Sequence, residues 1–200
     1  MEAGAQDRAV DARRRLVASR SLGLFARLGF DKVSFRDISR ATGVPRTAIY
    51  RCFHTKREIF DAAIGGVLAE LRRTINATLA ERNPATVRLA RVCALVVDGL
   101  FEHRDFLCAI FNFVFAMVTT GEDMSARVDG FTGGLKRAFR RLLSEGRDDG
   151  SVRGNVDPEI SAELLFALME SVAFNILLNL EKDSRIARSR FKAAITAISA

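Results

Sequence analysis

The segment from Ser34 to Lys56 contains two short helical patterns joined by a glycine turn, and it constrains the fold more than any other part of the chain. Ser34 precedes an apolar pattern and Asp37 follows three residues later, an arrangement that satisfies backbone donors at the start of a helix. Gly43 can take the positive φ that a sharp helix end needs. Pro45 suits the first turn of a new helix, because its missing N–H would be unpaired there. The segment therefore predicts a helix-turn-helix, a layout that DNA-binding proteins use.

The second helical pattern of this segment has two faces of opposite chemistry. The residues that point outward at spacings of three and four are Arg46, Thr47, Tyr50, Arg51 and His54. The residues that can face inward are Val44, Ile49, Cys52 and Phe53. Arginine can bind guanine edges with two hydrogen bonds, and threonine and tyrosine can reach phosphates or base edges. The outer face favours contact with a DNA duplex, while an ordinary polar surface helix is the alternative interpretation.

Basic residues are concentrated in the same part of the chain. The first 60 of the 200 residues hold 13 Lys and Arg against 6 Asp and Glu, whereas the remaining 140 residues hold 18 of each. The whole net charge of +7 therefore lies in the segment with the helix-turn-helix pattern. A polyanionic partner explains this distribution, because neutralising phosphates supplies much of the affinity for DNA. A basic surface that only aids solubility would not explain why the excess ends with the motif.

A longer series of residues resembles the TetR family of transcriptional repressors in order and spacing. The series is Leu24-Phe25-Ala26, Gly29-Phe30, Ser34-Phe35-Arg36-Asp37-Ile38-Ser39, Gly43-Val44, Ile49-Tyr50, Phe53 and Lys56-Arg57-Glu58, within residues 10–64. The resemblance implies an N-terminal three-helix DNA-binding domain over residues 8–64, followed by a helical ligand-binding and dimerisation domain over residues 65–200. It also implies that the helix over residues 45–53 enters the major groove.

By this resemblance, particular residues of the helix-turn-helix contact DNA. Phosphate contacts fall to Ser34, Tyr50, Thr55 and Lys56, and base readout falls to Arg46, Thr47, Ala48 and Arg51. Arg36 and Pro45 complete this DNA-binding set. The family often has serine at the position of Pro45, threonine at that of Ala48 and an aromatic residue at that of Cys52. Ala48 can offer only its methyl group to a thymine methyl, so the operator sequence stays open.

Helical periodicity continues through the rest of the chain. Apolar residues recur at spacings of three and four rather than alternating, and each of the three prolines marks a helix start, which predicts an all-α protein of about nine helices. The first helix is expected over Val10–Leu28, with Val17, Ser21, Leu24, Phe25 and Leu28 facing the core. The helices after the motif are expected over residues 56–81, 84–102, 105–119, 125–145, 158–180 and 184–198.

The helix expected over residues 105–119 is apolar on almost every side, and ten of the fifteen phenylalanines follow residue 100. A helix of this kind has to be buried all round. Two interpretations stay open: a filled Phe-rich core, or a cavity for an apolar or aromatic effector. Polar residues inside apolar runs need a partner, which can be a ligand, a neighbouring helix or another subunit. The candidate pocket residues are Phe111, Asn112, Phe115, Phe131, Met169, Glu170, Phe174 and Asn175.

The last two expected helices carry broad apolar faces, which suits a helical interface between two copies of the chain. In the family that the chain resembles, these helices form a four-helix bundle between subunits. The expected interface residues are Leu164, Leu168, Val172, Ile176, Phe191, Ala194, Ile195 and Ile198. Packing within one subunit is the alternative. A twofold dimer is favoured because one short recognition helix binds DNA weakly, whereas a dimer reads two half-sites.

Other classes of protein fit the sequence less well. Three scattered cysteines suit a reducing cytoplasm, and Cys93, His103 and Cys108 lack the spacing of a zinc site, so we expect neither metal nor cofactor. The N-terminal residues resemble no export signal, and the apolar run over residues 108–118 is too short to span a membrane. A small all-helical enzyme using His103 or Glu170 would need a catalytic constellation that the sequence does not show. A protein that coats DNA without sequence preference would need an intercalating or aromatic-interleaved basic surface.

Two adjacent glycines, Gly65 and Gly66, lie early in the helix expected over residues 56–81. Each costs a helix about 1 kcal/mol relative to alanine. Close packing against the first helix would explain them. A bend that couples effector binding to movement of the DNA-binding domain is the second explanation.

Overall fold

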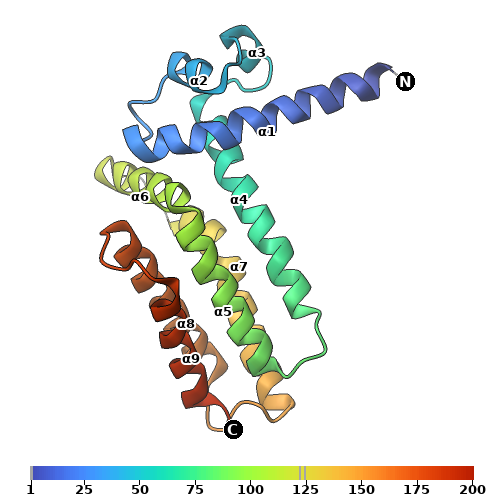
Figure 1. Cartoon of the computed structure of the whole chain (residues 1–200), viewed down its shortest axis with the longest axis vertical. Helices are drawn as coiled ribbons and strands as arrows, with labels where there is room; N and C mark the ends of the chain where they lie inside the picture. Colours follow the sequence, from blue (N-terminus) through green and yellow to red (C-terminus); the bar gives the residue numbers. More distant parts are fainter. Residues whose placement is uncertain (1, 122, 124) are drawn as a thin grey trace. The chain divides into compact units, whose positions relative to one another are not determined.

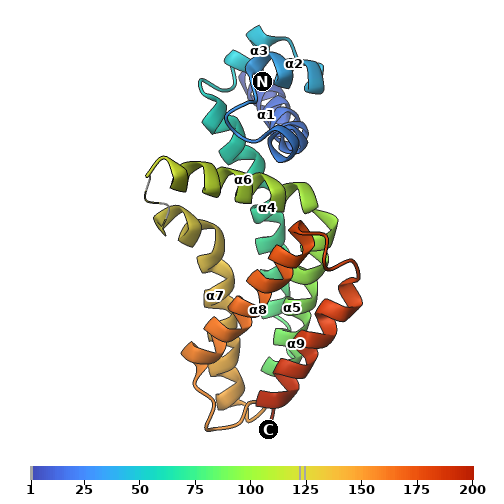
Figure 2. The same ribbon diagram turned by 90° about the vertical axis from the view of Figure 1, so that its left-hand side faces the viewer.

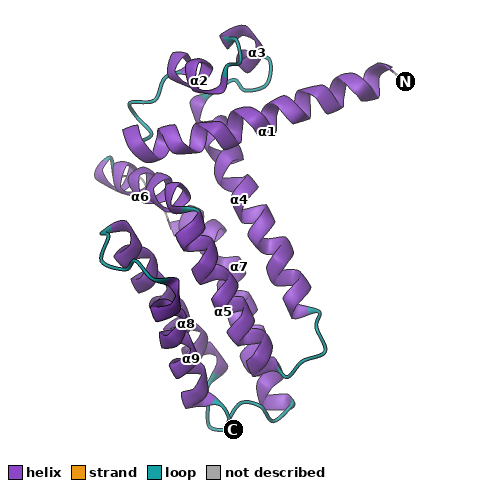
Figure 3. Cartoon of the chain, viewed as in Figure 1, coloured by secondary structure: helices purple, strands orange, loops and turns teal. Residues whose placement is uncertain are grey.

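The computed structural model describes residues 2–121, 123 and 125–200, apart from the side chains at positions 2–7, 127 and 131. The described residues form nine α-helices and one isolated bridge between Val152 and Ser199, and they contain no strand (Figures 1 and 3). The helices are α1 (Glu2–Leu28), α2 (Phe35–Thr42), α3 (Arg46–Tyr50), α4 (Lys56–Leu79), α5 (Ala85–Glu102), α6 (Arg104–Thr119), α7 (Ser125–Asp148), α8 (Pro158–Leu177) and α9 (Ser184–Ile198).

The all-α fold expected from the sequence is confirmed, while several helix ends differ from expectation. Helix α1 begins at Glu2, eight residues before Val10, and α3 is a single short turn of five residues. Helix α8 ends at Leu177, because Asn179 adopts a left-handed φ of 60°. The N–H groups of Leu180 and Glu181 then both donate to the Asn175 carbonyl, which closes the turn.

The first compact unit combines Met1–Ala69 with the later segment Asp105–Met124. Its core is an aromatic cluster in which Phe25 and Phe30 meet Phe60 of α4 and Phe113 of α6, with centroid distances of 4.6 to 5.9 Å. Phe25, Phe60 and Phe113 are fully buried. Residues of α6 therefore complete the core beneath the N-terminal helices.

One residue expected in this core lies elsewhere. Val17, Ser21, Leu24 and Phe25 of α1 are buried, but Leu28 is 42% exposed. Leu28 is the last residue of α1, and Gly29 turns the chain away with a φ of 77°, so no helix covers this side chain. The buried hydroxyl of Ser21 donates to the Val17 carbonyl at 2.7 Å, which satisfies its hydrogen-bonding need within the helix.

The second compact unit combines Glu70–Arg104 with Ser125–Ala200. Helix α5 packs against α7, α8 and α9, and these helices run side by side in Figure 2. The buried side chains between them include Leu89, Val92, Phe139 and Phe191. Burial raises the pKa of the Cys93 thiol in α5 to about 12, so this cysteine packs as a small apolar residue.

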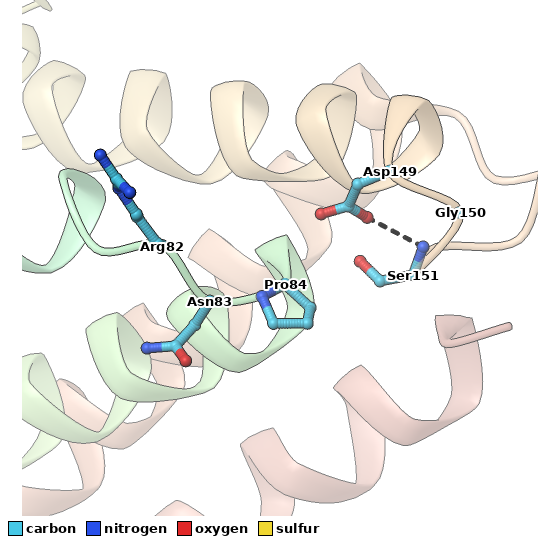
Figure 4. Close-up of a pocket in the computed structure, with 6 residues that line it drawn as sticks. All are labelled: Arg82, Asn83, Pro84, Asp149, Gly150 and Ser151. Atoms are coloured by element: carbon cyan, nitrogen blue, oxygen red, sulfur yellow. Dashed lines mark hydrogen bonds between the residues drawn. The ribbon is translucent and has the colours of Figure 1, made fainter.

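Polar contacts close one end of this bundle. The Arg88 guanidinium is nearly buried, lies 2.7 Å from a Glu145 carboxylate oxygen and donates to the carbonyls of Leu79 and Asn83. Asp149 accepts from the backbone N–H of Ala85 at 2.8 Å, at the start of α5. Beside it lies an open depression of about 550 Å³ (Figure 4), lined by Arg82, Asn83, Pro84, Asp149, Gly150 and Ser151. The Asp149 carboxylate would repel an anion that entered the depression. It also caps the start of α5, so its position has a structural explanation.

The adjacent glycines of α4 do not mark a site of close packing. A Cβ added at Gly65 or Gly66 would meet no atom within 4 Å. The close-packing explanation is therefore wrong, because the space that a methyl group would take is open. Helix α4 runs without interruption through both positions.

Candidate nucleic-acid interface

The turn between α2 and α3 has the geometry that the sequence predicted. The Ser34 hydroxyl accepts from the Asp37 backbone N–H at 3.3 Å, and the Ser34 N–H donates to the Asp37 carboxylate at 3.1 Å. The side-chain hydrogen bond from Ser34, supported by that backbone bond, lowers the pKa of Asp37. Gly43 ends α2 with a φ of 71°, and its N–H donates to the Ser39 carbonyl at 3.0 Å. The capping box and the glycine turn are thus both confirmed.

Helix α3 is anchored by its inner side and open on its outer side. The Pro45 carbonyl accepts the N–H groups of Ala48 and Ile49, and the Ile49 side chain is fully buried. The Tyr50 ring stacks on Phe35 of α2 with centroids 4.5 Å apart, although Tyr50 remains 48% exposed. This stack fixes the tyrosine ring while its outer edge stays accessible.

The start of α4 carries a similar cap that was not identified from the sequence. Thr55 accepts from the Glu58 N–H at 3.1 Å, and the His54 N–H donates to the Glu58 carboxylate at 3.0 Å. The signal was present, because threonine followed by glutamate three residues later is the sequence pattern of this cap. Two capped helix starts, at α2 and α4, therefore flank α3, and the carboxylates of Asp37 and Glu58 already interact with the positive ends of these helices.

Lys56, expected to contact a phosphate, is engaged inside the first unit. Its ammonium donates to the Asp31 carbonyl at 3.0 Å and lies 4.5 Å from the centroid of the Phe30 ring. Partial burial lowers its pKa. The lysine thus ties the loop before α2 to the start of α4, and any phosphate contact would be additional to this role.

The other residues of the expected DNA-binding set lie within residues 34–55, at the ends and outer sides of α2, α3 and α4. Ala48 is half-buried, and the remaining members are exposed: Ser34, Arg36, Pro45, Arg46, Thr47, Tyr50, Arg51 and Thr55. The structure therefore gathers basic, hydroxyl and aromatic groups around one short exposed helix. This arrangement can present donors to a groove and to its flanking phosphates.

Two arginines of α1, which the sequence showed only as part of the basic excess, also belong to this region. Arg14 donates to the Cys52 carbonyl just after α3, and Arg20 donates to the Thr42 carbonyl at the end of α2 at 3.2 Å. Neither contact could be found from local pattern, because the partners are 38 and 22 residues apart in the chain.

The candidate pocket residues are divided between the two compact units. Phe111, Asn112 and Phe115 belong to the first unit, where the Asn112 amide donates to the Ala26 carbonyl of α1 at 3.0 Å. Asn112 therefore joins α6 to α1, so its polar group has a partner without a ligand. Four other candidates lie on α8 in the second unit, where they point different ways: Met169 is buried, Asn175 is half-buried, and Glu170 and Phe174 are exposed. The side chain of Phe131 lies outside the described residues.

The expected dimer interface also needs correction. Val172, Ile176, Phe191 and Ile195 are almost fully buried within one subunit, so they form its core and offer no surface to a second copy. Leu168, Ala194 and Ile198 are half-buried, and Leu164 is 65% exposed. The reason is that α8 is apolar nearly all round, so spacing alone did not show which side packs inward.

Helix α8 has an outer apolar face that shares only Leu164 with the expected interface. The face comprises Ile160, Leu164, Ala167, Ser171 and Phe174, which are exposed at spacings of four and three, and the exposed Glu159, Glu163 and Glu170 border it. By its length and composition, helix α8 could cross a membrane. This is weak evidence for a membrane span, because core helices of soluble proteins pass the same test. The inner face of α8 packs against α5 and α7, which explains why that side is apolar. This packing does not explain the exposed apolar residues on the outer side.

Comparisons with known proteins agree with this architecture. Residues 19–63 match the family described as "Bacterial regulatory proteins, tetR family". The HTH-type transcriptional repressor DhaR of Mycobacterium sp. (strain GP1) is 23% identical over 155 residues, which cover 77% of each chain.

Two solved structures share the fold. A TetR transcriptional regulator from Chloroflexus aurantiacus superposes with a TM-score of 0.75 at 23% identity, covering 96% of this chain and 98% of that chain. The transcriptional regulator FadR from Bacillus subtilis, solved in complex with stearoyl-CoA, superposes with a TM-score of 0.74 at 16% identity, covering 92% and 98%.

Proposed function

We propose that this chain, which belongs to the TetR family of bacterial regulatory proteins, is a repressor that binds palindromic operator DNA as a homodimer and is released by a small-molecule effector. The observation that carries the proposal is the exposed outer side of α3, which is held on a capped helix-turn-helix. We place the regulator in the cytoplasm, where its DNA partner is.

In the proposed complex, α3 lies in the major groove. Arg46, Thr47 and Arg51 would read base edges, and Ala48 would offer its methyl group. Ser34, Tyr50 and Thr55 would contact phosphates on either side. Arg36 is exposed next to the capped start of α2 and would add a phosphate contact.

The proposed dimer uses the outer apolar face of α8. Alternating spacings of four and three are typical of helices that pack lengthwise against other helices. Helix α9 carries exposed small residues, including Ser189, Ala193 and Ala197, which allow a second helix to approach closely. A homodimer of this kind would present two copies of α3 to two half-sites, which compensates for the few contacts that a five-residue helix can make.

The proposed effector is an apolar or aromatic small molecule. Two observations support this class: the concentration of phenylalanine after residue 100, and the similarity in fold to a FadR that binds stearoyl-CoA. Acyl chains are therefore the first compounds to test. The effector can act only through different affinities for the DNA-bound and released shapes, and DNA must weaken effector binding by the same factor.

Selection of bound duplexes from a random pool tests the proposal. We expect enrichment of a palindrome, and a gel shift in which the selected duplex binds far more tightly than the starting pool. Equal affinity for both pools would defeat the repressor hypothesis and favour a protein that coats DNA without sequence preference.

Substitution of single arginines then assigns the base contacts. Arg46→Ala should lower discrimination at one operator position by ~1–3 kcal/mol, because a bidentate contact to a base is lost. Arg147→Ala, an exposed arginine at the end of α7, is the matched control and should leave discrimination unchanged.

A further inference from the structure

Two arginines of α1 hold the ends of both helices of the helix-turn-helix. The Arg14 guanidinium donates to the Cys52 carbonyl and lies 4.4 Å from the centroid of the Phe53 ring. Arg20, two helical turns further along α1, donates to the Thr42 carbonyl at 3.2 Å. Thr42 is the last residue of α2, and Cys52 follows α3 by two residues. The same helix therefore contacts both ends.

These carbonyls need partners because of where they lie. Thr42 is the last residue of α2, so its carbonyl has no intrahelical donor, whereas Cys52 lies in the turn after α3. Cations near a helix end are favourable because of the helix dipole. Helix α3 has five residues, too few to be stable by itself. Its position thus depends on the buried Ile49 and Phe53 on one side and on Arg14 at its end.

The neighbours of Arg14 differ from it in their contacts. Arg13 and Arg14 are both half-buried and Arg15 is exposed, and of the three only Arg14 makes a side-chain hydrogen bond with the part of the chain that the structure describes. The guanidinium of Arg14 is instead enclosed between a carbonyl and an aromatic ring. The Lys56 ammonium makes the same pair of contacts with the Asp31 carbonyl and the Phe30 ring, so a cation held between a carbonyl and a ring occurs twice in the first unit.

We propose that Arg14 and Arg20 are positioning residues that set the orientation of α3 against α1 and α2, and thereby the discrimination between DNA sequences, without touching DNA themselves. This inference rests on the proposed function. Under this proposal, some basic residues of the N-terminal segment face DNA, and others hold the helices of the helix-turn-helix in position.

The test compares full-length Arg14→Met and Arg20→Met with the wild type and with Arg15→Met. Two duplexes of equal length are used, one selected by the wild type and one with its sequence scrambled. Methionine keeps an apolar stem beside Phe53 but removes the donor and the charge. The affinity of each protein for each duplex is measured from low to moderate salt. The active fraction of the protein is titrated first, so that unfolded molecules do not lower the apparent affinity.

We expect the Arg14 and Arg20 variants to lower the ratio of specific to non-specific affinity about tenfold or more, the size of the effect of one mismatched base pair. Their slope of log affinity against log salt should equal that of the wild type, because no phosphate contact is lost. Loss of a direct contact would instead reduce the slope by about 0.9 for each phosphate, with both duplexes weakened alike. That result for Arg14→Met would overturn the inference, as would an unchanged ratio.

Two further outcomes are separated by the design. If Arg14→Met does not fold, Arg20→Met decides the question by the same ratio of affinities and the same salt slope. If the wild type selects no sequence from the pool, the proposed function itself fails.

Discussion

The ring of Phe113 in α6 packs against the ring of Phe60 in α4, with centroids 4.6 Å apart. Phe30 and the Arg57 guanidinium also contact Phe113, at 5.2 and 4.3 Å from its centroid. A segment more than forty residues after the helix-turn-helix thus completes the core on which α1 and α4 rest. The first compact unit, which carries the helix-turn-helix, is therefore discontinuous in sequence, and α6 contributes to its core.

Phe113→Ala should lower the free energy of unfolding by about 3–5 kcal/mol, because a buried aromatic ring leaves a cavity between four elements. Urea unfolding followed by circular dichroism measures this change. Phe115→Ala, on the same helix but 57% exposed, is the matched control and should cost about 1 kcal/mol or less. Equal losses in the two variants would contradict the assignment of Phe113 to the core.

Replacing Gly65 and Gly66 by alanine should stabilise α4 by up to about 1 kcal/mol each, because the added methyl groups meet open space and alanine favours helix. Gly43→Ala should act in the opposite direction, because its φ of 71° is unfavourable for any residue with a Cβ. Thermal unfolding of the three single variants gives the sign of each stability change.

If the glycines also provide a bend, the double alanine variant should keep operator binding but respond more weakly to effector, and an unchanged response would exclude the bend.

Leu164→Glu should convert the proposed homodimer to monomer and abolish tight operator binding, because two carboxylates would meet in an apolar interface. Light scattering coupled to size-exclusion chromatography measures the mass in solution. Val87→Glu changes an exposed apolar residue of α5 in the same way and should leave the mass unchanged. A Leu164→Glu protein that remains dimeric would place the interface elsewhere.

Asp37 should make the stability of the N-terminal unit depend on acid pH. Its pKa is lowered from the ordinary 3.8 in the folded chain, chiefly by the hydrogen bond from Ser34. A folded pKa below the unfolded one means that the stabilisation is present above the ordinary pKa and is lost as the pH falls through the lowered value. The Asp37→Ala variant should therefore be less stable than wild type at neutral pH, with a difference that shrinks below pH 3.8. Asp11→Ala, at an exposed position of α1, is the control, and a pH-independent difference for Asp37→Ala would contradict the capping role.

Short-range features of this molecule were readable from the sequence alone. The Ser34 cap, the Gly43 turn and the exposure of Arg46, Thr47, Tyr50 and Arg51 each depend on residues within a few positions of one another. Chain-local hydrogen bonds and helical spacing decide them, so the pattern of residues is sufficient. For the same reason the nine helices were expected close to their observed positions.

Long-range contacts decided the rest. Arg14 and Arg15 are the same residue type at adjacent positions, so the sequence does not distinguish their roles. Only the fold places Arg14 against Cys52 and Phe53 and leaves Arg15 exposed. Helix α8 is apolar nearly all round, so its inner and outer faces were distinguished only by the helices that cover one of them. The sequence by itself determined that this chain is helical and carries a DNA-reading motif. The tertiary structure decided which charges face outward and which segments share a core, because both depend on residues brought together across the chain.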